Sequence, residues 1–189
     1  MSYRKKHGAE PNMVVVKKKF ETALVYACRT KNLEVIHLMM ENREVWALDC
    51  NLQNVDGETV LMVAVKNGDV DNVWLLMNDA SSLNLDLNAT TTVAPRGRTA
   101  FMLGCFEKEV EAVRAMLELD RAQAINPNRR DEKMNTAFIL ACKKTGISEK
   151  DARIPEMYEL LMSYAKKVGI ELKAKNNDGQ TAFDFYNPK

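Results

Sequence analysis

The stretch "TVLMVAVKNGDVDNVWLLM", residues 59–77, has the pattern of two short helices joined by a tight turn around Gly68. Related stretches begin at other threonines, and in each the second residue after the threonine is Leu or Phe. The repeated threonines are Thr22, Thr59, Thr99, Thr136 and Thr181. Because this pattern recurs along the chain, an internal repeat decides the fold.

Positions within the repeat are counted from each threonine as zero. Position +5 is small in four copies: Ala27, Ala64, Gly104 and Ala141. Apolar residues recur at +11, +14, +17 and +18, which lie on one face of the second helix. A single unit cannot bury this face alone, so the units must stack on one another. The sequence therefore predicts an all-α solenoid of helix–turn–helix units.

The repeat resembles the ankyrin-repeat family, whose signature is T-P-L-H-x-A followed by a turn and a second apolar helix. The last copy, "NNDGQTAFDFYNPK" at residues 176–189, is similar to the truncated unit that often closes such arrays. The resemblance implies an ankyrin-repeat domain over residues 17–189, with four main units and a C-terminal cap. Residues 1–16 would precede it as a basic N-terminal arm.

The copies depart from the family pattern in three ways. Apolar residues replace the histidine, so contacts between units are expected to be mainly apolar. Lys31 and Lys108 stand where the turn usually has glycine, so these two turns are expected to be distorted. Extra residues predict elongated β-hairpin-like fingers between units and one insertion inside the fourth unit. They fall at 41–57, 78–97 and 118–134, and near 148–156.

Composition and charge exclude several classes of protein. Hydrophobic residues make up 46% of the chain and charged residues 28%, as in ordinary soluble domains. No apolar run approaches the roughly 20 residues of a membrane span. The net charge of +1 gives no global attraction to nucleic acid. The basic arm could touch nucleic acid, an acidic protein or acidic lipid, but it lacks interleaved aromatic residues, which argues against a nucleic-acid role.

The cysteine pattern points to packing rather than chemistry. Four cysteines without a CxxC pair indicate free thiols in a reducing compartment, so we expect a cytoplasmic protein. Cys28, Cys105 and Cys142 occupy position +6, where Val65 stands in the remaining unit, so this position accepts a purely apolar side chain. Cys50, in a finger, is the cysteine expected to be exposed.

Catalytic and metal motifs are missing from the sequence. Neither histidine has a nucleophile at a recognisable spacing, and there is no metal-ligand spacing or phosphate-binding loop. We therefore expect a non-catalytic protein without cofactors. An enzyme that uses an exposed cysteine is the disfavoured alternative.

The family's usual contact positions are on the concave side and predict a partner-binding surface. There the third and fourth units gather cations around Phe106, which would be either an exposed anchor or folded against the next unit. The concave residues are Arg96, Arg98, Phe106, Arg129, Arg130, Lys133, Lys143 and Lys144. On the convex side, Trp74 and Tyr158 at position +15 mark a second contact or pack against a finger.

The expected function is protein–protein recognition by an adaptor or scaffold, through the concave groove and the fingers. The cations favour an acidic protein partner. The alternative from the same sequence is a structural building block of a large cytoskeletal or ciliary assembly.

Overall fold

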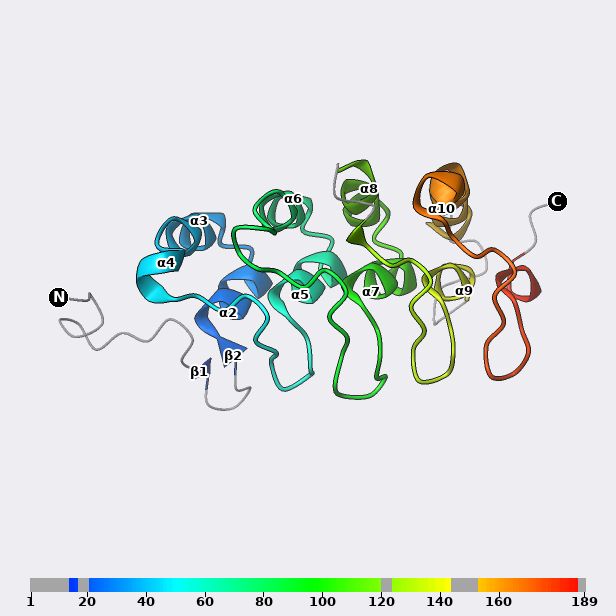
Figure 1. Ribbon diagram of the computed structural model, residues 1–189, viewed down its shortest axis with the longest axis horizontal. Coiled ribbons are helices and arrows are strands. Elements are labelled where there is room, and N and C mark those ends of the chain that lie inside the picture. Colours follow the sequence, from blue (N-terminus) through cyan, green and yellow to red (C-terminus); the bar gives the residue numbers. More distant parts are fainter. Residues whose placement is uncertain (1–13, 17–20, 120–123, 144–152, 187–189) are drawn as a thin grey trace.

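The computed structural model describes residues 14–16, 21–119, 124–143 and 153–186. It shows helical pairs stacked side by side in an elongated row (Figure 1). The first helices of the pairs are α2 (Ala23–Arg29), α5 (Val60–Lys66), α7 (Ala100–Glu107) and α9 (Ala137–Cys142). The second helices are α3 (Leu33–Glu41), α6 (Val70–Asn78), α8 (Val110–Glu118) and α10 (Arg153–Val168). The predicted all-α solenoid is confirmed.

We number these pairs as units one to four. Three smaller elements complete the row: α4 (Arg43–Trp46) after α3, the 3-10 helix η2 (Ala182–Asp184) against α9, and an antiparallel pair of β1 (Val14–Val16) with β2 (Glu21–Thr22). Elsewhere the described residues form no strand. Part of the arm, residues 1–13, and much of the predicted insertion lie outside the described residues.

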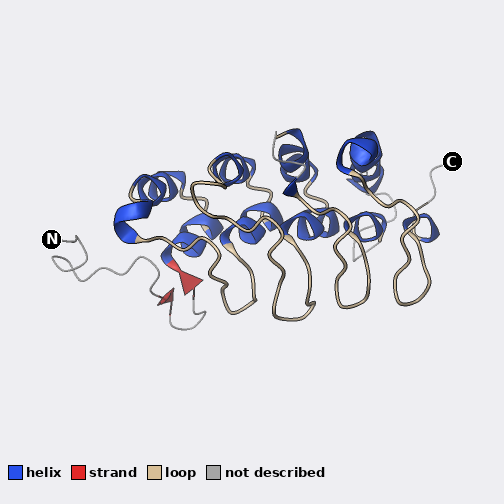
Figure 2. Cartoon of the chain, in the orientation of Figure 1, coloured by secondary structure: helices blue, strands red, loops and turns tan. Residues whose placement is uncertain are grey.

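Long loops project to one side of the row, each ahead of a first helix or of η2 (Figure 2). We call them finger two (residues 51–58), finger three (86–98), finger four (125–135) and finger five (170–180), after the unit that each precedes. In fingers two, four and five, a side chain and one main-chain hydrogen bond close a turn, without regular paired strands. In finger two, Asn54 Oδ1 accepts from the amides of Asp56 (3.0 Å) and Glu58 (2.9 Å). Asp131 and Asn176 do the same in fingers four and five, which is typical of Asx turns.

The repeated threonine begins each first helix. It has an extended backbone, and its hydroxyl accepts from the amide three residues later. These distances are 3.3 Å at Thr22, 3.5 Å at Thr59, 3.2 Å at Thr99 and 3.4 Å at Thr136. A threonine in this position satisfies an amide that the helix leaves unpaired. Helix capping therefore explains why the threonine recurs in every unit.

Small residues at position +5 let neighbouring units approach closely, as expected. At Gly104 an added Cβ would lie 2.6 Å from Val65 Cγ1 and 2.7 Å from Val113 Cγ2. Contacts between units are not only apolar, however. Three asparagines, Asn51, Asn88 and Asn128, each bind the loop after the next second helix through two hydrogen bonds. The Nδ2 of each donates to a main-chain carbonyl of that loop, and its Oδ1 accepts from the main-chain amide two residues after that carbonyl. These pairs of hydrogen bonds set the register between successive loops.

The turns at Lys31 and Lys108 are not distorted, so that prediction was wrong. Both residues adopt the left-handed conformation, with φ of 54° and 63°, close to the 62° of Gly68. The lysine backbones accept a conformation that favours glycine, at a cost of about 1 kcal/mol each. Lys108 offsets this cost with hydrogen bonds from its ammonium group to three main-chain carbonyls.

Unit one has an uncovered side. Tyr26, Val35 and Leu38 are 41%, 38% and 52% exposed, at repeat positions +4, +13 and +16. The same positions of unit three are Leu103, Ala112 and Ala115, and they are 5%, 1% and 2% exposed because unit two covers them. The exposed residues of unit one therefore form the face to which a preceding unit would pack. Within the described part of the chain, no helix is long and apolar enough to cross a bilayer.

Candidate partner-binding groove

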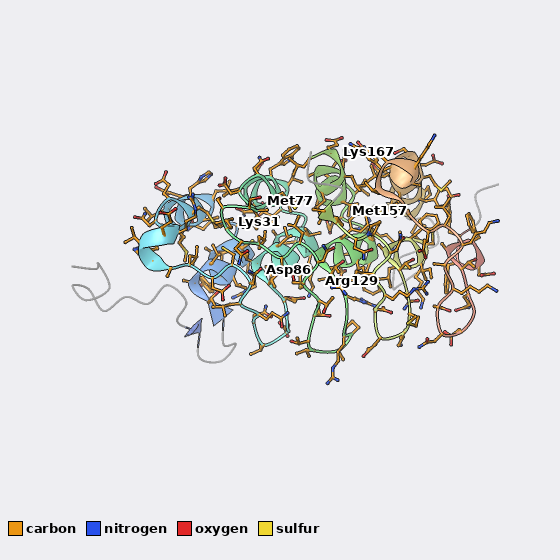
Figure 3. All side chains as sticks on the ribbon, viewed as in Figure 1. Lys31, Met77, Asp86, Arg129, Met157 and Lys167 are labelled. Carbon is orange, nitrogen blue, oxygen red and sulfur yellow. The ribbon has the colours of Figure 1, made fainter. Side chains whose placement is uncertain are left out.

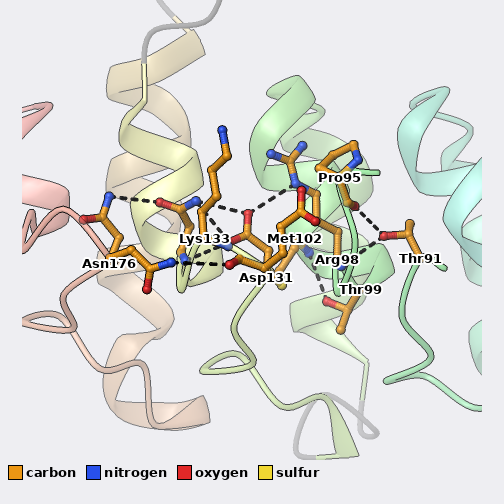
Figure 4. A network of polar contacts seen from close by, with 11 residues as sticks. Thr91, Pro95, Arg98, Thr99, Met102, Asp131, Lys133 and Asn176 are labelled. Atoms are coloured by element: carbon orange, nitrogen blue, oxygen red, sulfur yellow. Dashed lines mark hydrogen bonds and ion pairs between the residues drawn. The ribbon is translucent and has the colours of Figure 1, made fainter. Parts of the chain in front are cut away.

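Arg98 lies at the base of finger three, directly before the capping residue Thr99 (Figure 4). Its guanidinium carbon lies 4.2 Å from the centroid of the Phe106 ring, which is on α7. Its Nε lies 3.5 Å from Asp131 Oδ2 of finger four. Arg98 is only 9% exposed, so the prediction of an exposed cation was wrong here. Phe106 is half-buried, so it is neither the fully exposed anchor nor the fully covered side chain that the sequence left open.

Asp131 and Asn135 together connect finger four to both of its neighbours. Its Oδ1 accepts from the amides of Lys133 (3.0 Å) and Asn135 (2.8 Å), while the Oδ2 side faces Arg98. The Asn135 side chain donates to both Asp131 oxygens at 3.1 Å and accepts from Asn176 Nδ2 at 3.2 Å. This network, drawn in Figure 4, holds fingers three, four and five in a fixed order.

Two other predicted arginines bind within the protein. Arg129 Nη2 donates to the carbonyl of Asn88 at 3.3 Å. Arg130 Nη1 donates to the carbonyl of Lys175 at 2.8 Å, and its Nη2 lies 3.7 Å from Glu171. Figure 3 shows Arg129 among the side chains of the fingers.

Three lysines and one arginine complete the predicted set. Lys143 is half-buried, with Nζ 5.1 Å from the centroid of the Phe185 ring. Lys144 lies outside the described residues. Arg96 and Lys133 are exposed, and neither makes an ion pair with another described side chain. With Arg129, which is also exposed, they are the accessible cations of the predicted set among the described residues.

A cleft of about 420 Å³ lies between fingers two and three and reaches α5 and α7. Its walls include the apolar residues Val93, Leu103 and Phe106. Acidic residues also line it, which the prediction of a basic surface did not include: Asp56, Glu58 and Glu107. The prediction followed cations at single repeat positions, whereas the cleft collects residues from two units. Counting acidic as well as basic residues in neighbouring units would have identified the acidic residues of this cleft.

The convex residues have different environments. Trp74 is half-buried and packs against the core. Tyr158 is only 7% exposed, so its predicted outward position was wrong. Its ring lies 5.7 Å from Phe138 and 5.2 Å from Tyr186, measured between centroids. Tyr186 follows η2, so the C-terminal segment covers the face of α10 that carries this tyrosine.

None of the cysteines is accessible. Cys28, Cys105 and Cys142 are fully buried, and Cys50 is 2% exposed, which contradicts the expected exposure of Cys50. Burial raises the pKa of Cys28, Cys105 and Cys142 to about 12 and that of Cys50 to about 11. A thiol in such surroundings is a poor nucleophile at neutral pH.

Comparison with known proteins adds one positive finding. A protein-family model described as ankyrin repeats (3 copies) matches residues 5–91. No curated protein matches the chain.

Proposed function

Because the chain belongs to the ankyrin-repeat family, whose members generally bind other proteins, we propose that it is a non-catalytic recognition module. Its partner would lie in the groove formed by the first helices and the fingers. A stack of repeats offers an extended binding surface without a catalytic site.

The observation that carries this proposal is a series of exposed apolar residues on successive fingers. Val55, Val93 and Met134 are 42%, 46% and 42% exposed. Single exposed apolar residues are common, but a series on neighbouring loops of one groove is typical of an interaction surface. The exposed cations Arg96 and Lys133 lie beside them on fingers three and four. They suit an acidic feature of the partner and would speed its association.

The experiment is affinity capture of partners followed by mass spectrometry, with a charge-reversed groove. We compare the wild type with Arg96→Glu/Lys133→Glu and with the control Lys166→Glu/Lys167→Glu on α10. Both double variants change the net charge equally, and all four positions are exposed. The groove variant should lose the partner, and the control should keep it. Equal recovery with both variants would reject the groove as the binding surface.

A structural building block is the second candidate, and the uncovered face of unit one favours it. Tyr26, Val35 and Leu38 would pack against a neighbouring helical unit in an assembly. Such a protein should co-sediment with its assembly, and Leu38→Glu should release it. A protein that stays in the supernatant in both forms would exclude this role.

A further inference from the structure

The cleft between fingers two and three has excess negative charge. Lys66 Nζ lies 2.6 Å from Glu58 Oε1, and the carboxylates of Glu107 and Asp56 also act on this lysine. Burial lowers the pKa of Lys66, but its hydrogen bond to Glu58 and these three negative charges outweigh this effect and raise the pKa overall. Arg29, which lines the neighbouring cleft with Asp56 and Glu58, adds a second positive charge. Three carboxylates therefore face two cations.

Arg98 does not reverse this balance, because Asp131 neutralises it. The two side chains are 11% and 1% exposed, so their ion pair is shielded from solvent. Arg98 Nε makes no hydrogen bond within the described residues, although it is buried at the wall of the cleft. A guanidinium has five N–H donors, and those that remain can meet a main-chain carbonyl of a bound segment.

The apolar wall suits a long side chain with a charged end. Val93, Leu103 and Phe106 line the cleft, and Glu107 is half-exposed beside them. The methylene groups of a lysine or arginine can pack on such a wall while the cation reaches a carboxylate. An acidic side chain would instead meet Glu107 and Asp56 with like charge.

The sign of the accessible charge changes one unit further along the groove. Three exposed cations of fingers three and four make no ion pair with a described side chain: Arg96, Arg129 and Lys133. The exposed acids of the same two fingers are Asp86 and Glu132, so positive charge is in excess there. Neighbouring helices pack about 10 Å apart. An extended chain covers that distance in about three residues.

We propose that the cleft between fingers two and three receives a lysine or arginine of an extended partner segment, whose acidic residue about three positions away meets Arg96 and Lys133. This inference rests on the proposed function and names the chemistry of the partner. The partner is therefore a segment with both charges in a fixed order, rather than a uniformly acidic protein.

Selection from a random dodecapeptide library displayed on phage tests this pattern. The bait is the full chain, as wild type and as Asp56→Asn/Glu107→Gln. The wild type should enrich peptides with a basic residue about three positions from an acidic one. Synthetic peptides of the recovered sequence should bind the Asp56→Asn/Glu107→Gln variant about fivefold more weakly, as expected for two exposed ion pairs. The control Asp71→Asn/Glu118→Gln removes two exposed carboxylates from the second helices and should not change binding.

Three outcomes separate the inference from the proposed function. Enrichment of basic residues that depends on Asp56 and Glu107 supports the inference. Peptides that lose binding with Arg96→Glu/Lys133→Glu but show no basic residue would overturn the inference and leave the groove as the binding surface. No enrichment, or binding that no groove variant changes, would overturn both.

Discussion

Replacing Lys108 with methionine should destabilise the fold by about 3 kcal/mol. The Lys108 side chain is 1% exposed, and its Nζ donates to the carbonyls of Cys105 (3.1 Å), Phe106 (3.2 Å) and Leu140 (2.9 Å). The first two carbonyls belong to the end of α7, and the third belongs to α9. One ammonium group therefore links unit three to unit four and satisfies carbonyls that the helix end leaves unpaired.

The magnitude follows from two opposing effects. Methionine has a similar length but donates no hydrogen bond, and each buried carbonyl left without a donor costs about 1–3 kcal/mol. Removing the buried charge offsets part of this destabilisation, because taking an ammonium group out of water is itself unfavourable by several kcal/mol. Burial lowers the pKa of Lys108 from 10.5 to about 8, which has the same origin. We expect the unpaired carbonyls to outweigh the relief.

The pH dependence of stability has a definite sign. The folded pKa of about 8 lies below the unfolded value of 10.5, so the unfolded state binds more protons between these values. Lys108 therefore makes the wild type gain stability as the pH rises through this range, and this gain is lost as the pH falls through 8. The methionine variant lacks the effect, so the difference in stability between the two proteins should grow with pH.

Urea unfolding followed by circular dichroism measures both quantities. Lys31→Met is the matched control, because Lys31 occupies the same turn position with φ of 54° but is exposed. It should change the free energy of unfolding by less than about 0.5 kcal/mol. A Lys108→Met variant as stable as the wild type at neutral pH would refute the argument from unpaired carbonyls.

Three further predictions concern packing. Cys142, like the other cysteines, should react with a thiol reagent only on unfolding, and fast labelling of the native protein would contradict its burial. Cys142→Val should lower the free energy of unfolding by less than about 1.5 kcal/mol. Gly104→Ala should destabilise by about 1–3 kcal/mol in thermal unfolding, and adding Val65→Ala should recover part of the loss, because the new methyl group meets that valine. Leu38 and Ala115 share position +16 but are 52% and 2% exposed. Leu38→Glu should therefore leave the melting temperature nearly unchanged, whereas Ala115→Glu should lower it strongly. Equal effects would show that this face of unit one is covered.

The repeat pattern predicted the fold because it records packing directly. Small residues at +5 and apolar residues at +2 and +14 have one role in every unit, so each copy supports the others. The structure places Leu61, Phe101 and Val113 in the core as the pattern requires. The role of the repeated threonine was missed, although a threonine before an apolar helix is a known capping signal.

Exposure of individual side chains was harder to predict. Arg98 has a position that is exposed in a generic repeat, but Asp131, 33 residues later in the sequence, brings it into a buried ion pair. Cys50 was expected to be exposed because the sequence places it in a finger, whereas it is buried in the core. Such outcomes depend on one specific neighbour from another unit, and no repeated pattern encodes that neighbour.

The same reasoning decides which charges a partner meets in the groove. A count of formal charges on units three and four suggests a basic surface, because lysine and arginine outnumber the visible acids there. The structure lowers this count: Arg98 pairs with Asp131 and Arg130 lies beside Glu171, whereas Arg129 donates to a neutral carbonyl and keeps its charge. Carboxylates of finger two and α7 then become the dominant accessible charges in the neighbouring cleft. We therefore expect a partner in this groove to meet the charges that remain accessible after the fingers have contacted one another.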